Sequence, residues 1–503
     1  MSPFLSELKC TQCGKTYTPK TYISTCPYCN GVLEAVYALE KIREEITPND
    51  LEHRIPGVWK YFEFLPLSSK YNIVSLGEGG TFLHRCERLA KHIGLQDFYL
   101  KDETTNPTGA FIDRGTTVEV SKLKEFGIQS VYCGLTGNLA ASLVAYAARA
   151  GLRCKVFLPQ QVDIGKFYQT IAYGADVEIA GDSKEACWKA YNMAAQESAH
   201  GNTTHFVMPY NLHFLEGEKT TAYEICEQLN WTLPDQIIVP TGSGGHLSMI
   251  WKGINELYQI GFLKEKTVKI VGTQAEGCAP IVEAFKRRSN EITPAEKVST
   301  IAIDISVKEP PCGFMALNAI RESKGMAISV LDKEIVDAVR LLAKLEGVFA
   351  EPASATTIAG LKKLVEEGEI HSSEKVVCVI TGMGLKYPEV AKTLVKGSKK
   401  LEELLRRVER RKYSTRLGET KMRILRIVSK KESYGYEIWK DLREEFGVKM
   451  KIPSVYQHLA ELESAGLLTR SRSEQVLGKT KRNYYKLAEK GRSVLIHLEK
   501  MAT

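Results

Sequence analysis

The feature that most constrains the fold of this chain is an alternation of short apolar runs with longer helical patterns, between about residues 70 and 395. Runs that are apolar throughout are typical of parallel strands, because helices then cover both faces of the sheet. The alternation therefore predicts an α/β fold whose ligands bind at the carboxyl ends of the strands. The runs stand at residues 130–135, 154–159, 237–240, 269–274 and 375–381.

Three of these runs end in loops that contain glycine. The first is followed by Gly137 and Asn138, a later one by residues 241–246, and the last by residues 381–384. Glycines let backbone N–H groups approach an anion, and a helix N-terminus adds a favourable dipole. One such loop is weak evidence, because tight turns also use glycine. Three of them at strand ends indicate a ligand site.

Four cysteines lie close together near the N-terminus. Cys10 and Cys13 form one Cys-x-x-Cys pair, and Cys26 and Cys29 form a second. Two such pairs supply the tetrahedral sulfur shell that suits Zn²⁺. Because the protein provides all four ligands, no position is left for catalysis, and we expect a structural zinc ribbon over residues 1–40.

The bulk composition is that of an ordinary globular protein, with 44% hydrophobic and 25% charged residues. The remaining cysteines are scattered singly, so no disulfide framework is expected. The first residues lack the basic and apolar regions of a signal peptide, and no apolar run has the length of a membrane span. These observations predict a cytoplasmic protein with no membrane partner.

The charge is distributed unevenly along the chain. Residues 401–503 hold 24 Lys and Arg against 14 Asp and Glu, whereas the whole chain has a net charge of +8. The segment before residue 401 is therefore slightly acidic. A basic C-terminal segment beside a nearly neutral body indicates an anionic partner, most simply nucleic acid.

Residues 1 to about 395 resemble the threonine synthases, which are pyridoxal-phosphate enzymes of fold type II. The resemblance implies a domain of this tryptophan synthase β-like fold over residues 41–400. It implies that Asn138 bonds the pyridoxal hydroxyl and that Thr381 faces the pyridine nitrogen. The loop that would hold the cofactor phosphate consists of Gly242, Ser243, Gly244, Gly245 and His246. The matching stretches are GEGGTFL (77–83), LKDETTNPTGAFIDRG (100–115), TGNLAASLVAYAARAG (136–151), EGEKTTAYEICEQL (216–229), PTGSGGHLSMIWKG (240–253), EGVFAEPASATTIAGL (346–361) and TGMGLKYP (381–388).

One residue departs from the family pattern at its reactive position. The family's lysine stands between Phe and Asp in its SFKDRG motif, and here Ile112 stands between Phe111 and Asp113. An isoleucine forms no imine, does not titrate and donates no hydrogen bond, so both tasks of the lysine are lost. The sequence therefore predicts a pseudoenzyme.

A second departure concerns the substrate, O-phosphohomoserine. Family members commonly carry Asn, Ser and Arg that help to bind its phosphate, and an ungapped alignment places Met208, Pro209 and Phe214 there. Apolar groups thus replace multi-donor phosphate recognition. Three interpretations stay open: Lys101 or Lys219 substitutes for the missing amine, the pocket is a relic, or it still binds a ligand.

A pocket that binds without turnover is what a sensor needs. Its candidate ligands are pyridoxal phosphate held non-covalently, an amino-acid adduct of it, threonine, or another phosphorylated metabolite.

The basic C-terminal segment has its own pattern. Residues 401–416 have helical periodicity and are expected to form a linking helix. The pattern over residues 417–503 then predicts three helices. It also predicts two strands around Gly478 and Lys479, and a last helix from about Lys490 to Met501. Three helices with a basic β-hairpin are typical of a winged helix-turn-helix.

This segment resembles the PadR-type transcriptional regulators, which carry YGYEI, PSVYxxLxxLExxGLL and YYKLxEKGR stretches. In that family the third helix enters the major groove and the wing lies along the DNA backbone. The resemblance implies base and phosphate contacts from the third helix, charge from the wing, and a homodimer formed through the last helix, with Val494, Leu495 and Leu498. The implied groove residues are Ser454, Tyr456, Gln457 and His458, and the implied wing residues are Lys479, Lys481 and Arg482.

The sequence as a whole predicts a ligand-responsive transcriptional regulator. A threonine synthase-like body without its lysine would sense a small-molecule effector, and a winged-helix dimer would bind a two-fold-symmetric operator DNA. By analogy with the parent family, the regulated genes would concern amino-acid metabolism. The alternative is a working threonine synthase with a displaced lysine and a regulatory DNA-binding tail.

Overall fold

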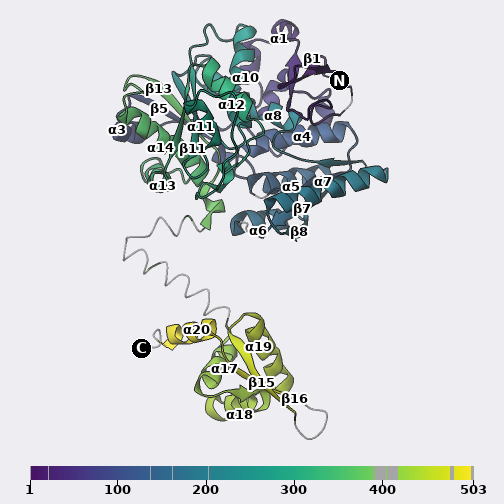
Figure 1. Cartoon of the computed structure of the whole chain (residues 1–503), viewed down its shortest axis with the longest axis vertical. Helices are drawn as coiled ribbons and strands as arrows, with labels where there is room; N and C mark the ends of the chain where they lie inside the picture. Colours follow the sequence, from purple (N-terminus) through teal and green to yellow (C-terminus); the bar gives the residue numbers. More distant parts are fainter. Residues whose placement is uncertain are drawn as a thin grey trace. The chain divides into compact units, whose positions relative to one another are not determined.

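The computed structural model describes residues 2–499, apart from residues 21, 136, 161–162, 202, 389, 391–403, 405–416 and 476–480. It divides the chain into two compact units, Met1–Leu394 and Val395–Thr503, each described by itself (Figure 1). The predicted linking helix 401–416 lies outside the described residues except for Leu404. None of the described helices combines the length and the apolar character needed to cross a membrane.

A six-stranded sheet forms the centre of the first unit. Its strand order is β12-β11-β10-β13-β5-β4, and neighbours pair in parallel except for β4, which is antiparallel to β5. The predicted apolar runs 237–240, 269–274 and 375–381 all lie in this sheet. The strands are β4 (Phe82–Arg85), β5 (Asp97–Asp102), β10 (Gln236–Pro240), β11 (Lys269–Ala275), β12 (Met326–Val330) and β13 (Lys375–Ile380).

Helices cover both faces of this sheet. Along β10, Ile237 and Val239 pack in one apolar core and Ile238 in another, because successive side chains of a strand point to opposite faces. The first core contains α9, α10 and α12, and the second contains α3, α13 and α14 (Figure 1). These helices are α3 (Glu87–Ile93), α9 (Thr220–Gln228), α10 (Gly245–Gln259), α12 (Gly313–Glu322), α13 (Asp332–Glu346) and α14 (Pro352–Glu366); α11 (Pro280–Lys286) follows β11.

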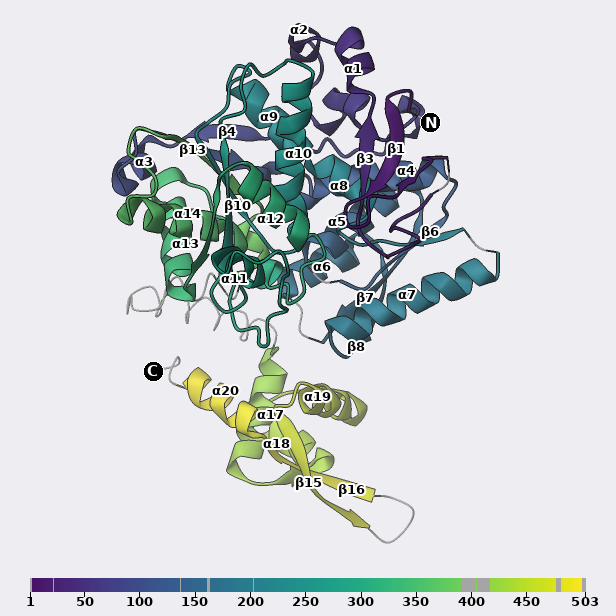
Figure 2. The same cartoon turned by 45° about the horizontal axis from the view of Figure 1, so that its top comes forward.

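A second, four-stranded parallel sheet has the order β8-β7-β6-β9. The predicted runs 130–135 and 154–159 lie in it. One face packs against α4 and α5, and the other packs against α7, which runs beside β7 and β8 (Figure 2). The elements are α4 (Ile112–Glu125), β6 (Ser130–Cys133), α5 (Asn138–Ala150), β7 (Arg153–Pro159), α6 (Ile164–Ala172), β8 (Asp176–Ala180), α7 (Ser183–Ala199), β9 (Thr204–Phe206) and α8 (Leu212–Glu218).

The N-terminal residues form a small antiparallel sheet of order β2-β1-β3, followed by two short helices. Leu8, Cys10, Cys26 and Leu33 are buried in the same core as α9 and α10. The ribbon is therefore packed on the body and shares its core. Its elements are β1 (Leu5–Cys10), β2 (Thr16–Tyr17), β3 (Leu33–Tyr37), α1 (Leu39–Glu45) and α2 (Pro48–Glu52).

The second unit is a winged helix-turn-helix, as the sequence predicts. Three helices pack around one core, and a three-stranded sheet of order β14-β16-β15 carries the hairpin. Gly447 and Gly466 have φ values of 65° and 67°, which end the second and third helices in a left-handed turn. The elements are α17 (Glu419–Lys430), β14 (Ser433–Tyr434), α18 (Gly435–Phe446), α19 (Ile452–Ser464), β15 (Leu468–Gln475), β16 (Lys481–Leu487) and α20 (Glu489–Glu499).

Candidate functional site

The glycine loop between β10 and α10 has the geometry of an anion cradle. Gly244 has a φ of +90°, which L side chains rarely adopt. A Cβ on Gly242 would lie 2.9 Å from Ile305 Cα, and one on Gly244 would lie 2.7 Å from the carbonyl oxygen of Cys312. Both positions therefore require glycine. The first N–H groups of α10 have no partner inside the helix, so the loop offers donors to an anion.

Two buried titratable side chains adjoin this loop in neutral form. Burial lowers the pKa of His246 to about 3, and its Nε2 lies 3.0 Å from the Thr221 hydroxyl. Burial raises the pKa of Glu218 well above its ordinary value, which favours the neutral carboxyl. Glu218 Oε2 lies 3.4 Å from where a Cβ on Gly245 would be, and it has no hydrogen-bond partner among the described residues.

The two side chains expected to bind the pyridine ring are joined by a carboxylate. Asn138 is the first residue of α5, and its Nδ2 donates to Glu351 Oε2 at 3.0 Å. Thr381 follows β13, and its hydroxyl donates to Glu351 Oε1 at 2.8 Å. Burial, followed by the nearby Asp304, raises the pKa of Glu351 to about 7. Helix α5, which follows a strand of the four-stranded sheet, and the end of β13 in the six-stranded sheet thus each contribute one side chain to this candidate site.

Ile112 is the first residue of α4, and only 8% of its surface is exposed. Its side chain packs in an apolar core with residues of α5, such as Leu139 and Leu143. The neighbouring Phe111 ring stacks on His246 with ring centroids 4.1 Å apart. The position at which the sequence predicts the loss of the family's lysine thus carries a packed aliphatic group.

Phe214, which aligns with the substrate-binding arginine of the family, is fully buried in α8. A Cβ on Gly115 would lie 2.6 Å from its ring, so α4 and α8 pack closely around this phenyl group. The side chain serves the core and has no polar atom to offer a phosphate.

Neither lysine considered as a substitute has its amine at this pocket. Lys101 Nζ lies 2.7 Å from Glu224, 2.8 Å from the Thr81 carbonyl oxygen and 2.9 Å from Gln228. Lys219 Nζ lies 2.6 Å from Glu216 and 2.9 Å from Glu256. These partners belong to buried ion clusters, so in this structure the amines of Lys101 and Lys219 are both paired with carboxylates.

Lys101 is part of what we call the Arg114 cluster. Arg114 has no exposed surface, and its guanidinium lies 2.6 Å from Glu103 and 2.7 Å from Glu224. Burial raises the pKa of Glu224, but Arg114 and Lys101 overcome this effect and hold it well below its usual range. Two cations thus neutralise two carboxylates within one dry cluster: Arg114, Lys101, Glu103 and Glu224.

Two other lysines do reach the pocket, and the sequence reasoning missed both. Lys386 Nζ donates to Asn138 Oδ1 at 2.9 Å, and its side chain is buried. Lys166 Nζ donates to Asp304 Oδ1 at 2.7 Å and also contacts the Tyr387 hydroxyl. The sequence signal that could have indicated Lys386 is its place in the TGMGLKYP stretch, which directly follows a strand. We call this group the Asn138 cluster: Asn138, Lys166, Asp304, Glu351 and Lys386.

The four N-terminal cysteines converge as predicted. Their sulfur atoms all lie within 4.8 Å of one another, with 3.5 Å between Cys10 and Cys29 and 3.7 Å between Cys13 and Cys26. A zinc ion with four sulfur ligands at about 2.3 Å needs sulfur–sulfur separations of roughly 3.8 Å. The cluster therefore fits a structural zinc ion.

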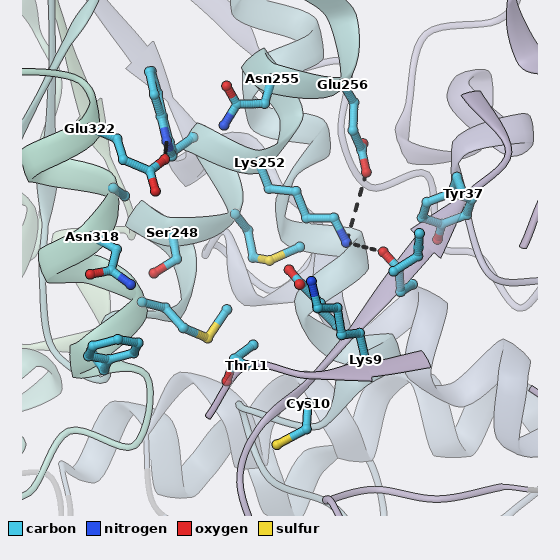
Figure 3. A pocket seen from close by; sticks show the side chains of 18 of the residues that line it. Lys9, Cys10, Thr11, Tyr37, Ser248, Lys252, Asn255, Glu256, Asn318 and Glu322 are labelled. Carbon is cyan, nitrogen blue, oxygen red and sulfur yellow. Dashed lines mark hydrogen bonds and ion pairs between the residues drawn. The ribbon is translucent and has the colours of Figure 1, made fainter. Parts of the chain in front are cut away.

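A cleft of about 540 Å³ lies where the ribbon meets α10 and α12 (Figure 3). Lys9, Thr11, Ser248 and Asn318 are among its lining residues. Lys252, in its wall, is paired with Glu256 (Figure 3). It also forms an ion pair with Glu216. The glycine loop does not line this cleft, so it is separate from the pocket described above.

The predicted groove residues lie on α19. Tyr456 and Gln457 are exposed, and Ser454 and His458 are half-buried. A Cβ on Gly435 would lie 2.5 Å from the Tyr456 ring, so this tyrosine also packs on the start of α18. Pro453 is in the first turn of α19, and no side chain caps the helix start. Free N–H groups at such an end suit a DNA phosphate.

The predicted wing is the β15–β16 hairpin. Arg482 is exposed, and its guanidinium lies 4.8 Å from the Tyr434 ring centroid. Lys479 lies outside the described residues, as does the side chain of Lys481. In α20, Leu495 is buried in the core of its own unit, so it is not available to a second subunit as the sequence led us to expect. Leu498 has no described side chain.

Family comparisons agree with this two-part architecture. Residues 74–382 match the model of the pyridoxal-phosphate dependent enzyme family, and the chain belongs to that family. Within it, the similar proteins are threonine synthases. Residues 424–497 match the transcriptional regulator PadR-like family.

The sequence relatives cover nearly the whole first unit. Threonine synthase of Methanocaldococcus jannaschii is 46% identical over 385 residues, which are 76% of this chain and 93% of that protein. Threonine synthase of Methanosarcina acetivorans is 42% identical over 384 residues, covering 76% of this chain and 92% of that protein. These relatives place the body among the threonine synthases.

Solved structures support the fold alone, because their sequence identities are low. Processed threonine deaminase isoform 2 from Solanum lycopersicum has a TM-score of 0.54 at 19% identity, covering 68% of this chain and 98% of that one. Maize serine racemase has a TM-score of 0.53 at 20% identity, covering 63% and 92%. Both likenesses agree with a fold type II body.

Proposed function

We propose that this protein is a DNA-binding transcriptional regulator whose threonine synthase-like body binds a small molecule without converting it. The observation that carries the proposal is the combination of Ile112, packed at the start of α4, with a winged helix on the same chain. A body that binds but does not turn over its ligand can bias one arrangement of the protein over another.

The residues of the pocket fit a pyridine ring with a phosphate. The Gly242–Gly245 backbone would hold the phosphate, Asn138 the ring hydroxyl and Thr381 the ring nitrogen. Pyridoxal phosphate, when bound, supplies an aldehyde that condenses with primary amines. Because burial raises the pKa of Glu218, its carboxyl is favoured in the neutral form, which could donate to a phosphate oxygen. Phe111 and His246 stack beside the loop and exclude water.

In the DNA-binding unit, Ser454, Tyr456, Gln457 and His458 would meet base edges, and the wing would contact phosphates. A homodimer on a two-fold-symmetric operator supplies two such helices. Because Leu495 is buried, the dimer surface must use other residues.

The test is binding of full-length protein to its own promoter region, measured by fluorescence anisotropy at several salt concentrations. We expect binding at ~50 mM salt that weakens as salt rises, because phosphate contacts release counterions. Arg482→Ala should reduce the salt slope by about one, whereas Arg149→Ala, an exposed arginine on α5, should not. No binding at low salt would overturn the proposal.

A working threonine synthase with a regulatory tail is the second candidate, and it is favoured by the sequence relatives, which are threonine synthases. Turnover of O-phosphohomoserine by purified wild-type protein decides between the two. The proposal expects no threonine above a no-protein control, whereas the alternative expects steady production.

A further inference from the structure

Lys386 lies next to the loop that has lost its lysine. The backbone N–H of Phe111 donates to the Thr381 carbonyl at 2.8 Å, and that of Met383 donates to the Gly109 carbonyl at 2.9 Å. These two bonds join the residues before Ile112 to the residues before Lys386. A Cβ on Gly109 would lie 3.4 Å from Lys386 Cε, so glycine leaves room for this side chain.

The amine of Lys386 contacts the asparagine expected to take the pyridoxal hydroxyl. Its Nζ lies 2.9 Å from Asn138 Oδ1. In pyridoxal phosphate the hydroxyl and the aldehyde stand on adjacent ring carbons. An amine bonded to the partner of the hydroxyl is therefore a neighbour of the aldehyde carbon.

The two pocket lysines differ in their partners. Lys166 is held by the Asp304 carboxylate at 2.7 Å, with Asp163 at 3.7 Å, and such partners favour the charged ammonium. The hydrogen bond of Lys386 goes to an amide oxygen. Burial lowers the pKa of Lys386, which also faces Glu351, Asp113, Lys166 and Asp304. A neutral amine is the nucleophilic form.

Glu218, beside the glycine loop, is a second observation that favours a ligand at this site. Glu218 is 98% buried, and its Oε2 has no hydrogen-bond partner among the residues that the structure describes. It lies beside Gly245 and Ser243 of the glycine loop. A protonated carboxyl at an anion cradle can donate to a phosphate oxygen.

We propose that Lys386 replaces the missing lysine as the group that captures a phosphorylated aldehyde in this pocket. The amine nitrogen forms a double bond to the aldehyde carbon, and the carbonyl oxygen leaves as water, so no oxidant or reductant is consumed. The inference rests on the proposed function, because it names the ligand chemistry of the same pocket. It replaces non-covalent retention of the cofactor by a reversible covalent link.

The experiment adds pyridoxal phosphate to full-length protein, reduces it with borohydride and maps the modified lysine by mass spectrometry. We expect about one stable adduct per chain, on the peptide that contains Lys386. The Lys386→Arg variant should form at least tenfold less of that adduct. Ile112→Lys is the positive control, because it restores an amine at the family position and should itself be labelled.

Two further probes separate the parts of the ligand. Pyridoxal, without phosphate, should label Lys386 at least tenfold less at equal concentration, since it leaves the glycine loop empty. Deoxypyridoxine phosphate, without the aldehyde, should compete with labelling but form no adduct. If pyridoxal labels Lys386 equally well, the phosphate requirement is wrong.

Adducts on Lys166, or only on scattered surface lysines, would overturn the capture by Lys386. DNA binding of the same unlabelled preparation is measured in parallel. If the protein binds DNA but forms no adduct on Lys386, only this inference is wrong. An adduct on Lys386 without DNA binding removes only the proposed function.

Discussion

The Arg114 cluster and the Asn138 cluster are both buried in the first unit, yet their carboxyl groups have pKa values shifted in opposite directions. In the Arg114 cluster every cation lies within 2.7 Å of a carboxylate oxygen, and the pKa of Glu224 is held well below its usual range. In the Asn138 cluster the pKa of Glu351 is raised to about 7, and that of Lys386 is lowered, in each case chiefly by burial. Burial also lowers the pKa of Lys101 in the Arg114 cluster, so the difference lies in the two glutamates and in the hydrogen-bond partners of the two lysines.

We interpret this difference as that between a structural network and the proposed binding site. Charges that satisfy one another fix the packing of α4 against α9 and leave nothing for a ligand. Groups whose pKa values move toward neutrality are stabilised incompletely by their neighbours, and such groups gather at functional sites. A buried lysine is thus informative only together with the chemistry of its partners.

Arg114→Met is the change with the largest expected effect. It leaves Glu103 and Glu224 buried without their main cation, and breaking a buried pair in this way costs about 3–5 kcal/mol. Urea unfolding of the full-length protein measures the loss. Arg149→Met, at an exposed position on α5, is the control and should change the free energy of unfolding by less than about 0.5 kcal/mol. A loss below about 1 kcal/mol for Arg114→Met would remove the structural role of this cluster.

Glu351→Gln tests the pKa difference between the clusters. The pKa of Glu351 rises from 4.5 to about 7 on folding, so the folded state holds its proton more tightly. Its contribution to stability is then complete below about pH 4.5 and is lost as the pH rises toward 7. Wild type should lose stability across this window, and Glu351→Gln should lose less.

The measurement is the urea midpoint at closely spaced pH values. Asp113, whose pKa burial raises to about 6, leaves some slope in the variant. Glu366→Gln, at an exposed glutamate of α14, is the matched control and should keep the wild-type slope. Identical pH profiles for wild type and Glu351→Gln would show that this carboxyl titrates normally in the folded protein.

Most of the fold followed from local pattern. The apolar runs became β6, β7, β10, β11 and β13, because a strand buried on both faces needs continuous apolar residues. The cysteine spacing predicted a four-cysteine cluster, and in the structure the four sulfur atoms do lie together. What the pattern did not show is that the strands divide between two sheets, since pairing between distant strands leaves no local signal.

The site was predicted only in part. Asn138 and Thr381 could be named from their motifs, and Ile112 from the residue missing beside Asp113. Lys386 could not be singled out, because its meaning depends on a contact with Asn138 that spans 248 residues of sequence. The carboxylate partners of Lys101 and Lys219 also come from other segments, so the sequence could not show that these two amines are paired.

Lys386→Met is the change with the smallest expected effect on stability. Removing a lysine whose hydrogen bond goes to the Asn138 amide, and which forms no ion pair with any residue that the structure describes, should change the free energy of unfolding by less than about 1 kcal/mol. Lys101→Met is the matched comparison, because both lysines are buried and lie in the same unit. It leaves Glu224 short of a cation and should lose about 3 kcal/mol. Urea unfolding of the two variants side by side gives the contrast, and equal losses would mean that Lys386 is as structural as Lys101. A stable Lys386→Met protein that no longer takes the borohydride-trapped adduct would assign the amine to ligand capture rather than to folding.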